Sequence, residues 1–307
     1  MARRRRGRAI SGILVLDKPR GLSSNAALQR VKRLLDAQKA GHTGSLDPMA
    51  TGVLPLCFGE ATKVSQYLLD ADKGYSSTFI LGVATDTGDA EGEIKSRADA
   101  STVSEADVLA AMATLTGDIE QIPPMYSALK HQGKPLYALA RQGVEIKRTA
   151  RKISILQFEL LKFIPGQYAE IEVDVRCSKG TYIRVLAEDL GAQLGLPCHV
   201  SRLRRTISGP FALSEAVSIE QLEAAHSGES QALDQFLVPI ESALAQFPPI
   251  FLSESASFYL QQGQPVLVPN GPRSGMVRIA DQTGAFLGIG EMLDDGRVAP
   301  RRLIATA

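Results

Sequence analysis

One stretch of the chain, residues 41–55, constrains the fold and the function more than any other. Its sequence, GHTGSLDPMATGVLP, holds three glycines, two prolines and a single carboxylate, that of Asp47. Glycine reaches backbone angles that other residues avoid, and it lets another backbone or a ligand approach closely. Pro48 fixes its own φ angle and biases Asp47 away from helical geometry. The stretch therefore predicts a rigid, open loop that presents one carboxylate, with His42 close in sequence.

Local chemistry allows a second interpretation of the same residues. Aspartate followed by proline is typical of a helix start, with Asp47 as the N-cap and Pro48 at the first helical position. The residue types at this place do not decide between the two. A phosphate-binding loop is excluded, because the pattern G-x-x-x-x-G-K-[ST] is absent from the stretch.

Length, charge and cysteine content set outer limits on the function. The 307 residues are enough for a substantial core and two domains. The net charge is +1, so binding of nucleic acid has to come from local basic patches. The three cysteines form no C-x-x-C pair, which predicts neither a zinc site nor a disulfide framework. No apolar run approaches the roughly 20 residues that cross a bilayer. We therefore expect a cytoplasmic protein without membrane contact.

Hydrophobic periodicity and capping residues predict the elements around residues 41–55. The predicted strands are residues 12–16, 75–83, 153–163 and 169–175. The predicted helices are residues 24–36, 63–69, 104–116, 185–194 and one that starts at Ser218. Residues 1–9, which include four consecutive arginines, are expected to form a disordered basic arm. The acidic turn at 86–93 lacks the spacing of an EF-hand, so we predict no calcium site there.

Residues 121–150 differ in kind, because they mix prolines with aromatic and basic side chains. The aromatic and basic residues are Tyr126, Lys130, Lys134, Tyr137, Arg141, Lys147 and Arg148. This composition predicts a loop and a short helix over 135–142 that project from the core. Phosphate attraction and base stacking make such a segment suitable for contact with nucleic acid. A solvated surface excursion has the same signature, and the residues alone leave both open.

The character of the chain changes near Phe247-Pro248-Pro249. Beyond this point, one short helical piece precedes several short strand patterns, which proline and glycine punctuate. The pattern predicts a compact all-β module over 250–307, joined to residues 1–249 through a proline linker.

Taken in order, the motifs of the chain resemble those of the TruB pseudouridine synthases. Residues 41–55 are similar to the family's catalytic motif, and the other matching blocks are LDKP at 16–19, GEATK at 59–63, DKGY at 72–75, PPMYSALK at 123–130 and SKGTYIR at 178–184. The resemblance implies an α+β fold. A mixed β-sheet pseudouridine synthase catalytic core with flanking helices would carry an RNA-clamping insertion at about 121–150. A small C-terminal β PUA-like domain would follow.

The resemblance also implies a reaction. The family converts uridine 55 in the T-loop of tRNA to pseudouridine: the bond from the base nitrogen to the ribose breaks, the base rotates, and its C5 is joined to the ribose. The target base has to be flipped out of a folded loop first. The family uses no metal and no organic cofactor. We expect a monomer whose partner is the T-arm stem-loop of tRNA and which needs no obligate protein partner.

The family's functional residues can be carried over position by position. Asp47 matches the catalytic aspartate and Arg184 the arginine that pairs with it. A nearby arginine typically lowers the pKa of an aspartate by ~1–3 units, so we expect Asp47 to stay charged in a closed site. Tyr75 matches the stacking tyrosine, a candidate for moving a proton. The other matches are His42, which fills the space that the base leaves, Tyr182 and Leu203, which line the pocket, and Lys18 and Lys63, which support structure and charge near the site.

Two alternatives stay open at the level of sequence. An RNA chaperone that folds tRNA would use the same binding surfaces without chemistry, alone or in addition to catalysis. The RNA-guided branch of the superfamily needs partner proteins and a guide RNA. That branch dispenses with the insertion at 121–150, so the presence of this segment favours a stand-alone enzyme.

Overall fold

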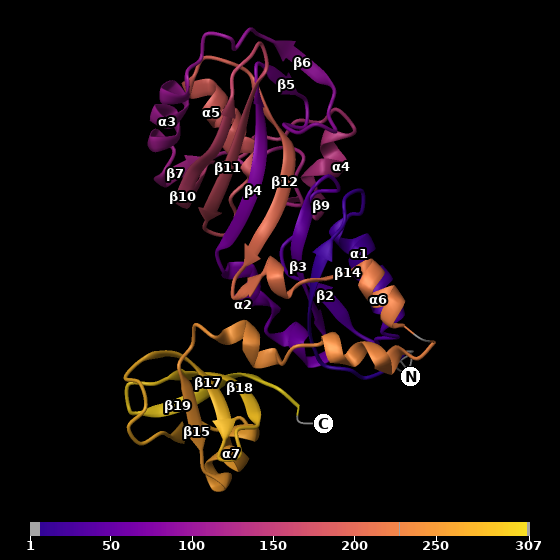
Figure 1. Cartoon of the computed structure of the whole chain (residues 1–307). Coiled ribbons are helices and arrows are strands. Elements are labelled where there is room, and N and C mark those ends of the chain that lie inside the picture. The colour runs from indigo at the N-terminus through magenta and orange to yellow at the C-terminus, as the bar shows by residue number, and fades with distance from the viewer. Residues whose placement is uncertain (1–6, 227, 306–307) are drawn as a thin grey trace.

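The computed structural model describes residues 7–226 and 228–305 (Figure 1). The arginine run at 3–6 lies outside the described residues. Arg8, which belongs to the arm expected to be disordered, is fixed instead. Its backbone N–H donates to the carbonyl of Asp36 at 2.5 Å, and its guanidinium pairs with Asp234. The prediction of disorder is therefore wrong for Arg8.

A ten-stranded mixed sheet forms the larger part of the molecule (Figure 1). Its main path runs through β14 (Val217–Ser218), β1 (Gly12–Lys18), β3 (Thr51–Phe58), β12 (Cys198–Ser208), β4 (Lys73–Leu81), β11 (Ala169–Cys177), β10 (Arg151–Ile164) and β7 (Gly117–Gln121). Off this path, β2 (Ala40–His42) pairs with β3, and β13 (Phe211–Ala212) pairs with β12. Neighbouring strands are antiparallel except β1–β14 and β3–β12. The predicted α+β class with a mixed sheet is confirmed.

Alternating side chains on β1 divide the interior into two cores, one on each face of the sheet. Leu14 and Leu16 join a core under four helices, whereas Ile13 and Val15 join a core on the opposite face. The four helices are α1 (Ser24–Leu34), α3 (Glu105–Thr114), α5 (Ile183–Gln193) and α6 (Ile219–Ala225). Serine side chains cap the first turns of α1, α3 and α6, as the sequence predicts.

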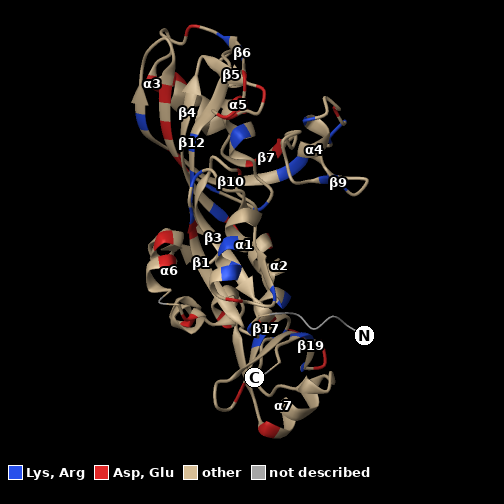
Figure 2. Ribbon diagram, turned by 90° about the vertical axis from the view of Figure 1, so that its right-hand side faces the viewer, with Lys and Arg blue, Asp and Glu red and all other residues tan. Residues whose placement is uncertain are grey.

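Short helical pieces cover the opposite face, and a second sheet lies beyond the lower end of the large sheet (Figure 2). The short pieces are η1 (Gly59–Lys63), α2 (Ser65–Asp70), η2 (Leu213–Glu215) and η4 (Ile240–Leu244). The second sheet runs in the order β15 (Pro249–Leu252), β17 (Gly275–Asp281), β18 (Phe286–Met292), β19 (Arg297–Leu303) and β16 (Val266–Leu267), with α7 (Glu254–Gln261) packed against it. Ile289 of β18 is fully buried in one cluster with Ile13 and Val53 of the large sheet. The boundary between residues 249 and 250 falls within β15 and stays a prediction.

The segment at 121–150 leaves the large sheet after β7 and returns to it at β10. It contains a small hairpin, β8 (Lys130–His131) and β9 (Lys134–Pro135), followed by α4 (Leu136–Ala140). Figure 2 shows this segment projecting sideways from the sheet, with basic residues along it. The remaining elements are β5 (Val83–Thr85), β6 (Ile94–Arg97) and η3 (Ser230–Phe236).

Two central strands are missing from the sequence-based predictions. The sequence predicts a loop over 41–55 and only a basic cluster at 201–205, whereas β3 and β12 occupy much of these stretches. Glycine and proline obscure the alternation of β3, and arginines obscure that of β12. The two strands pair with each other in parallel across a long separation in sequence, which no local pattern reveals. The helix predicted over 63–69 is instead the end of η1 followed by α2.

Candidate active site

The loop that carries Asp47 joins β2 to β3. The backbone N–H of Ala50 donates to the carbonyl of Asp47 at 3.0 Å, which closes a tight turn, and β3 begins at Thr51. No helix follows Asp47, so the interpretation of this residue as an N-cap is wrong. The reason is the run that comes next: Leu54 and its apolar neighbours in β3 are fully buried in the sheet. A strand buries them on both faces, which an exposed first turn of a helix would not.

Buried polar groups hold this loop on both sides of Asp47. The ammonium of Lys18, which is fully buried, donates to the carbonyls of Leu22 at 2.7 Å and Pro48 at 3.4 Å. Burial lowers the pKa of Lys18 to about 8. On the other side, the Ser24 hydroxyl accepts from the backbone N–H of Leu46 at 2.7 Å. Lys18 thus supports the loop without entering the pocket, which fits the supporting role expected for it.

Arg205 of β12 binds both the start of the loop and the strand that follows the loop. Its Nε donates to the carbonyl of Val53 at 2.6 Å, and its Nη2 donates to the carbonyl of Gly44 at 3.0 Å. Gly52 has a φ of +101°, and a Cβ there would lie 2.1 Å from the carbonyl oxygen of Arg205. Only glycine lets β3 and β12 approach this closely. The sequence pattern did not reveal Arg205 as a site residue, because its only signal was the basic cluster at 201–205.

Arg184, the second residue of α5, binds the carboxylate of Asp47. Its Nε lies 3.0 Å from Asp47 Oδ2 and 3.8 Å from Oδ2 of Asp89. Its remaining nitrogens donate to the carbonyls of Thr87 at 2.7 Å and Tyr126 at 2.6 Å. The guanidinium therefore ties together the Asp47 loop, the acidic turn at 86–93 and the projecting segment. Asp89 is a further site residue that the sequence pattern missed, although the turn that supplies it was visible.

The electrostatics of Asp47 differ from the expectation. Burial raises the pKa of Asp47, the charge of Arg184 opposes that rise, and the charge of Asp89 adds to it. The net direction is upward from the ordinary value, so the expected net lowering of the pKa is wrong, although Arg184 itself acts in the expected direction. Burial is the largest cause and outweighs Arg184, which also lies near Asp89. The Asp47 side chain keeps 40% of its surface exposed.

A pocket of about 390 Å³ opens beside this ion pair. Five of the expected site residues line it: Asp47, Tyr75, Tyr182, Arg184 and Leu203. Tyr75 comes from β4 and Leu203 from β12, and both are buried. Tyr182 stands directly before α5, where the side-chain amide of buried Gln121 bonds both its backbone N–H and its carbonyl, at 2.9 and 3.1 Å. An aromatic and apolar wall thus faces a carboxylate held by an arginine.

Sequence comparison now decides the family. Residues 32–183 match the model of the TruB family pseudouridylate synthase N-terminal domain, residues 184–245 the tRNA pseudouridylate synthase B C-terminal domain, and residues 248–304 the pseudouridine synthase II TruB C-terminal domain. The tRNA pseudouridine synthase B of Pseudomonas aeruginosa strain UCBPP-PA14 is 58% identical over 298 residues, 97% of each chain. That of Saccharophagus degradans is 53% identical, over 99% of this chain and 98% of the relative. The chain belongs to the TruB family.

Solved structures agree with the TruB fold. A chain from an H/ACA RNP bound to a substrate RNA containing 2′-deoxyuridine superposes with a TM-score of 0.74 at 24% identity, covering 96% of this chain and 85% of that chain. A chain from a Cbf5-Nop10-Gar1 complex gives a TM-score of 0.72 at 26% identity, with coverage of 96% and 84%. These likenesses extend over the whole molecule and support the pseudouridine synthase fold.

Three residues that the TruB resemblance assigned to the site do not line the pocket. Lys18 lies beneath the loop, as described above. His42 lies on β2, where its buried Nδ1 has no hydrogen-bond partner in the described structure, and burial together with Arg205 lowers its pKa. Lys63 lies on the other face of the sheet, pairs with Glu60 at 2.5 Å and donates to the carbonyl of Leu303 at 2.9 Å. Lys63 was expected to support the site, but in the structure it contacts the second sheet instead.

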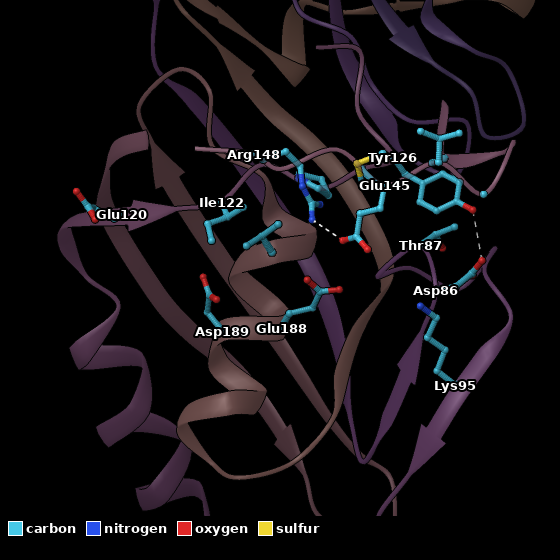
Figure 3. Close-up of a pocket in the computed structure, with 16 residues that line it drawn as sticks. Asp86, Thr87, Lys95, Glu120, Ile122, Tyr126, Glu145, Arg148, Glu188 and Asp189 are labelled. Atoms are coloured by element: carbon cyan, nitrogen blue, oxygen red, sulfur yellow. Dashed lines mark hydrogen bonds and ion pairs between the residues drawn. The ribbon is translucent and has the colours of Figure 1, made fainter. Parts of the chain in front are cut away.

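A second cavity, of about 770 Å³, lies between the projecting segment and α5 (Figure 3). Acidic side chains from several elements line it, among them Glu188 and Asp189, whose pKa values burial raises. The Tyr126 hydroxyl lies 3.5 Å from Oδ2 of Asp86 at the edge of this cavity (Figure 3). The backbone carbonyl of Tyr126 accepts a hydrogen bond from Arg184. Tyr126 of the projecting segment at 121–150 is thereby connected to the ion pair of Asp47 and Arg184.

Metal binding and membrane crossing leave no signature in the described part of the chain. Residues 7–226 and 228–305 hold no group of three or more His, Cys, Asp or Glu side chains arranged to bind a metal ion. Within the same residues, no helix has the length and apolar character that crossing a membrane requires.

Proposed function

We propose that this chain converts uridine to pseudouridine in tRNA, at position 55 of the T-loop, with Asp47 as the essential catalytic group. The observation that carries the proposal is the 3.0 Å ion pair between Asp47 and Arg184 beside a pocket walled by Tyr75, Tyr182 and Leu203. The relatives that share more than half of their residues with this chain are tRNA pseudouridine synthases B by name.

The chemistry requires a positioned carboxylate. Asp47 attacks the sugar or the base, or stabilises the sugar while the base leaves. All three roles need the ionised carboxylate, whose raised pKa increases its basicity and nucleophilicity. Arg184 holds the carboxylate in one orientation through its own fixed contacts, so little reorganisation is needed when the substrate binds.

A flipped nucleotide fits the dimensions and character of the pocket. Its volume of about 390 Å³ lies within the range of small-molecule pockets. Tyr75 supplies an aromatic face on which the extruded base stacks, while Leu203 and Tyr182 exclude water around it. His42 stands in the strand that leads into the catalytic loop. We propose that it fills the space in the RNA stack from which the base departs.

The projecting segment at 121–150 supplies an RNA clamp. The Arg141 guanidinium lies 5.7 Å from the centre of the Tyr137 ring, and both side chains are exposed. Exposed cations beside aromatic rings suit phosphates and unstacked bases together. The segment favours an enzyme that acts without guide RNA and protein partners. As the resemblance to the TruB family implies, we further propose a monomer that uses no metal and no organic cofactor. Its cytoplasmic location stays a prediction.

The test uses the purified chain and an unmodified T-arm stem-loop RNA. We expect pseudouridine at position 55 only, without added protein, guide RNA or metal. A matched RNA with cytidine at position 55 is the control, and it should bind but give no product. Absence of product from the uridine RNA, with binding retained, would favour an RNA chaperone. Product only after addition of a guide RNA and partner proteins would favour the RNA-guided branch.

A further inference from the structure

We propose that Arg205 is the cation that stabilises the negative charge of the uracil ring while its bond to the ribose is broken. The inference rests on the proposed function and concerns a residue outside the catalytic ion pair. The pocket would then be electrically polarised along the direction in which the reaction separates charge.

The negative end of the pocket is the side of Asp47. Here Arg184 faces two carboxylates, those of Asp47 at 3.0 Å and Asp89 at 3.8 Å. When both carboxylates are ionised, these three side chains carry one positive and two negative charges, and the Lys18 ammonium beneath the loop offsets part of the excess. A cation-like ribose carbon is stabilised on this side.

The positive end is formed by Arg205 and Lys73, which line the same pocket and are 1% and 7% exposed. Among residues 7–226 and 228–305, no carboxylate forms an ion pair with either side chain. Arg205 donates to the carbonyls of Val53 and Gly44, and Lys73 to those of Leu68 and Leu69 at the end of α2. Carbonyl dipoles offset the burial of these cations without neutralising them.

Tyr75, on which the base is proposed to stack, lies next to Arg205. In the pairing of β4 with β12, Tyr75 is the direct partner of Arg205. A base stacked on the Tyr75 ring therefore lies on the side of the pocket that holds Arg205. Burial, together with the Arg205 charge, lowers the pKa of Lys73 to about 8, which agrees with two unpaired cations close together.

The reaction creates the charge that Arg205 would stabilise. When the C1′–N1 bond breaks, its electron pair stays with N1, and the uracil ring carries a negative charge spread over O2 and O4. The ring then uses an electron pair to form the C1′–C5 bond, C5 loses its proton, and N1 gains one, so the product is an isomer of the substrate. If Asp47 instead adds to the base, the same ring oxygens take up the charge. A fixed cation in a site closed to water stabilises it strongly on either route.

The test measures how much Arg205→Gln slows two substrates whose bases differ as leaving groups. Fluorine at C5 withdraws electrons and stabilises the uracil anion, so a 5-fluorouridine substrate depends less on an external cation. Cleavage of the original glycosidic bond is followed under single-turnover conditions in T-arm RNAs that carry uridine or 5-fluorouridine at the target. We expect Arg205→Gln to slow the uridine RNA about 100-fold, the scale of losing one oxyanion donor, and the 5-fluorouridine RNA by a clearly smaller factor.

Controls separate this role from simple support of the loop. Arg205→Lys keeps the charge and should restore most of the rate on the uridine RNA, and exposed Arg202→Gln on the same strand should match the wild type. If Arg205→Gln does not fold, Lys73→Gln takes its place, with the same unequal loss expected. Equal losses on both RNAs would overturn the proposal and leave Arg205 a structural residue. An inactive wild-type chain would instead contradict the proposed function.

Discussion

Asp47 and Arg184 come from distant parts of the sequence, yet they form the contact on which the site depends. The ion pair measures 3.0 Å, and Arg184 is held by two backbone carbonyls besides. Burial nevertheless raises the pKa of Asp47 and outweighs Arg184, and the nearby charge of Asp89 adds to the rise. On the proposed function, ionised Asp47 serves the reaction, whereas its raised pKa means that the ionised form weakens the folded state.

Because the ionised carboxylate weakens the folded state, Asp47→Asn should be more stable than the wild type, by an amount that depends on pH. A folded-state pKa above the unfolded value of ~3.9 means that ionised Asp47 destabilises the fold. At pH 7.5 we therefore expect Asp47→Asn to unfold at a higher temperature than the wild type. The difference should shrink as the pH falls and vanish below the unfolded-state pKa, where the carboxyl is protonated in both states. Thermal unfolding followed by circular dichroism from pH 3.5 to 7.5 measures this.

Asp107→Asn is the matched control with the opposite sign. Hydrogen bonds from Ser104 in the capping box of α3 lower the pKa of Asp107. Its contribution to stability is present above the unfolded-state pKa and is lost as the pH falls through the folded-state pKa. Asp107→Asn should therefore lower the unfolding temperature at neutral pH. A lowered unfolding temperature for Asp47→Asn at pH 7.5 as well would contradict the assignment.

At the scale of elements, the position of the Asp47 loop depends on how closely β3 approaches β12. A Cβ at Gly52 would lie 2.1 Å from the Arg205 carbonyl oxygen, and the residue has a φ of +101°. Both the contact and the angle exclude other residues unless the strands move apart. The position of Arg205, and with it the loop, would change with them.

Gly52→Ala should therefore destabilise the fold by more than about 2 kcal/mol, since overpacking and a strained φ act together. Gly41→Ala, in the same loop motif, is the control: a Cβ at this position would have no other atom within 4 Å, and the φ of Gly41 lies outside the left-handed range. We expect Gly41→Ala to stay within about 1 kcal/mol of the wild type in urea denaturation, as surface substitutions do. Equal stability of the two variants would refute the close approach.

The proposed RNA clamp at 121–150 can be tested separately, also at the scale of elements. Charge reversal at exposed Arg141 and Lys147 should weaken T-arm binding and reduce the slope of log affinity against log salt by about two, one for each lost phosphate contact. Reversal at Lys162 and Arg202, which are exposed elsewhere on the sheet, is the matched control for net charge. Fluorescence anisotropy across a salt series provides the readout. An unchanged slope for the first pair would rule out a clamp.

The sequence predicts elements well where their signals are local. The serine caps of α1, α3 and α6 lie where capping residues precede apolar periodicity, and β11 alternates as expected. β3 and β12 were missed because their pairing is long-range and their composition is atypical of strands. In the site, motif order identified Asp47, Tyr75 and Arg184. Arg205 and Asp89 acquire their roles only through tertiary contacts, which the sequence pattern does not contain.

At the scale of the whole molecule, the second sheet lies beyond the end of the large sheet and joins the core on the face opposite α1 and α5 (Figure 1). Ile289 is fully buried in the same cluster as Ile13 and Val53, which belong to β1 and β3. Glu60 and Lys63 add polar contacts by bonding the backbone at the end of β19 and just beyond it. The strand that follows the Asp47 loop, β3, thus shares a core with the C-terminal sheet.

This packing predicts that the two sheets stabilise each other. Ile289→Ala should cost about 3 kcal/mol and increase hydrogen exchange in β1 and β3 as well as in β18. Leu267→Ala is the control, since Leu267 lies in the same C-terminal sheet but is 63% exposed. Faster exchange confined to residues 249–303 in Ile289→Ala would show that the sheets unfold independently.

The central claim is that Asp47 performs the chemistry on a tRNA uridine, and one measurement tests it most directly. Asp47→Asn and the wild type are compared for single-turnover formation of pseudouridine in the T-arm RNA, with binding measured in parallel. We expect RNA affinity to stay within a few-fold, because the carboxylate is one small part of the contact. Conversion should fall by at least about a thousandfold, the scale of losing an essential catalytic group. Conversion by Asp47→Asn at a rate near that of the wild type would contradict the account.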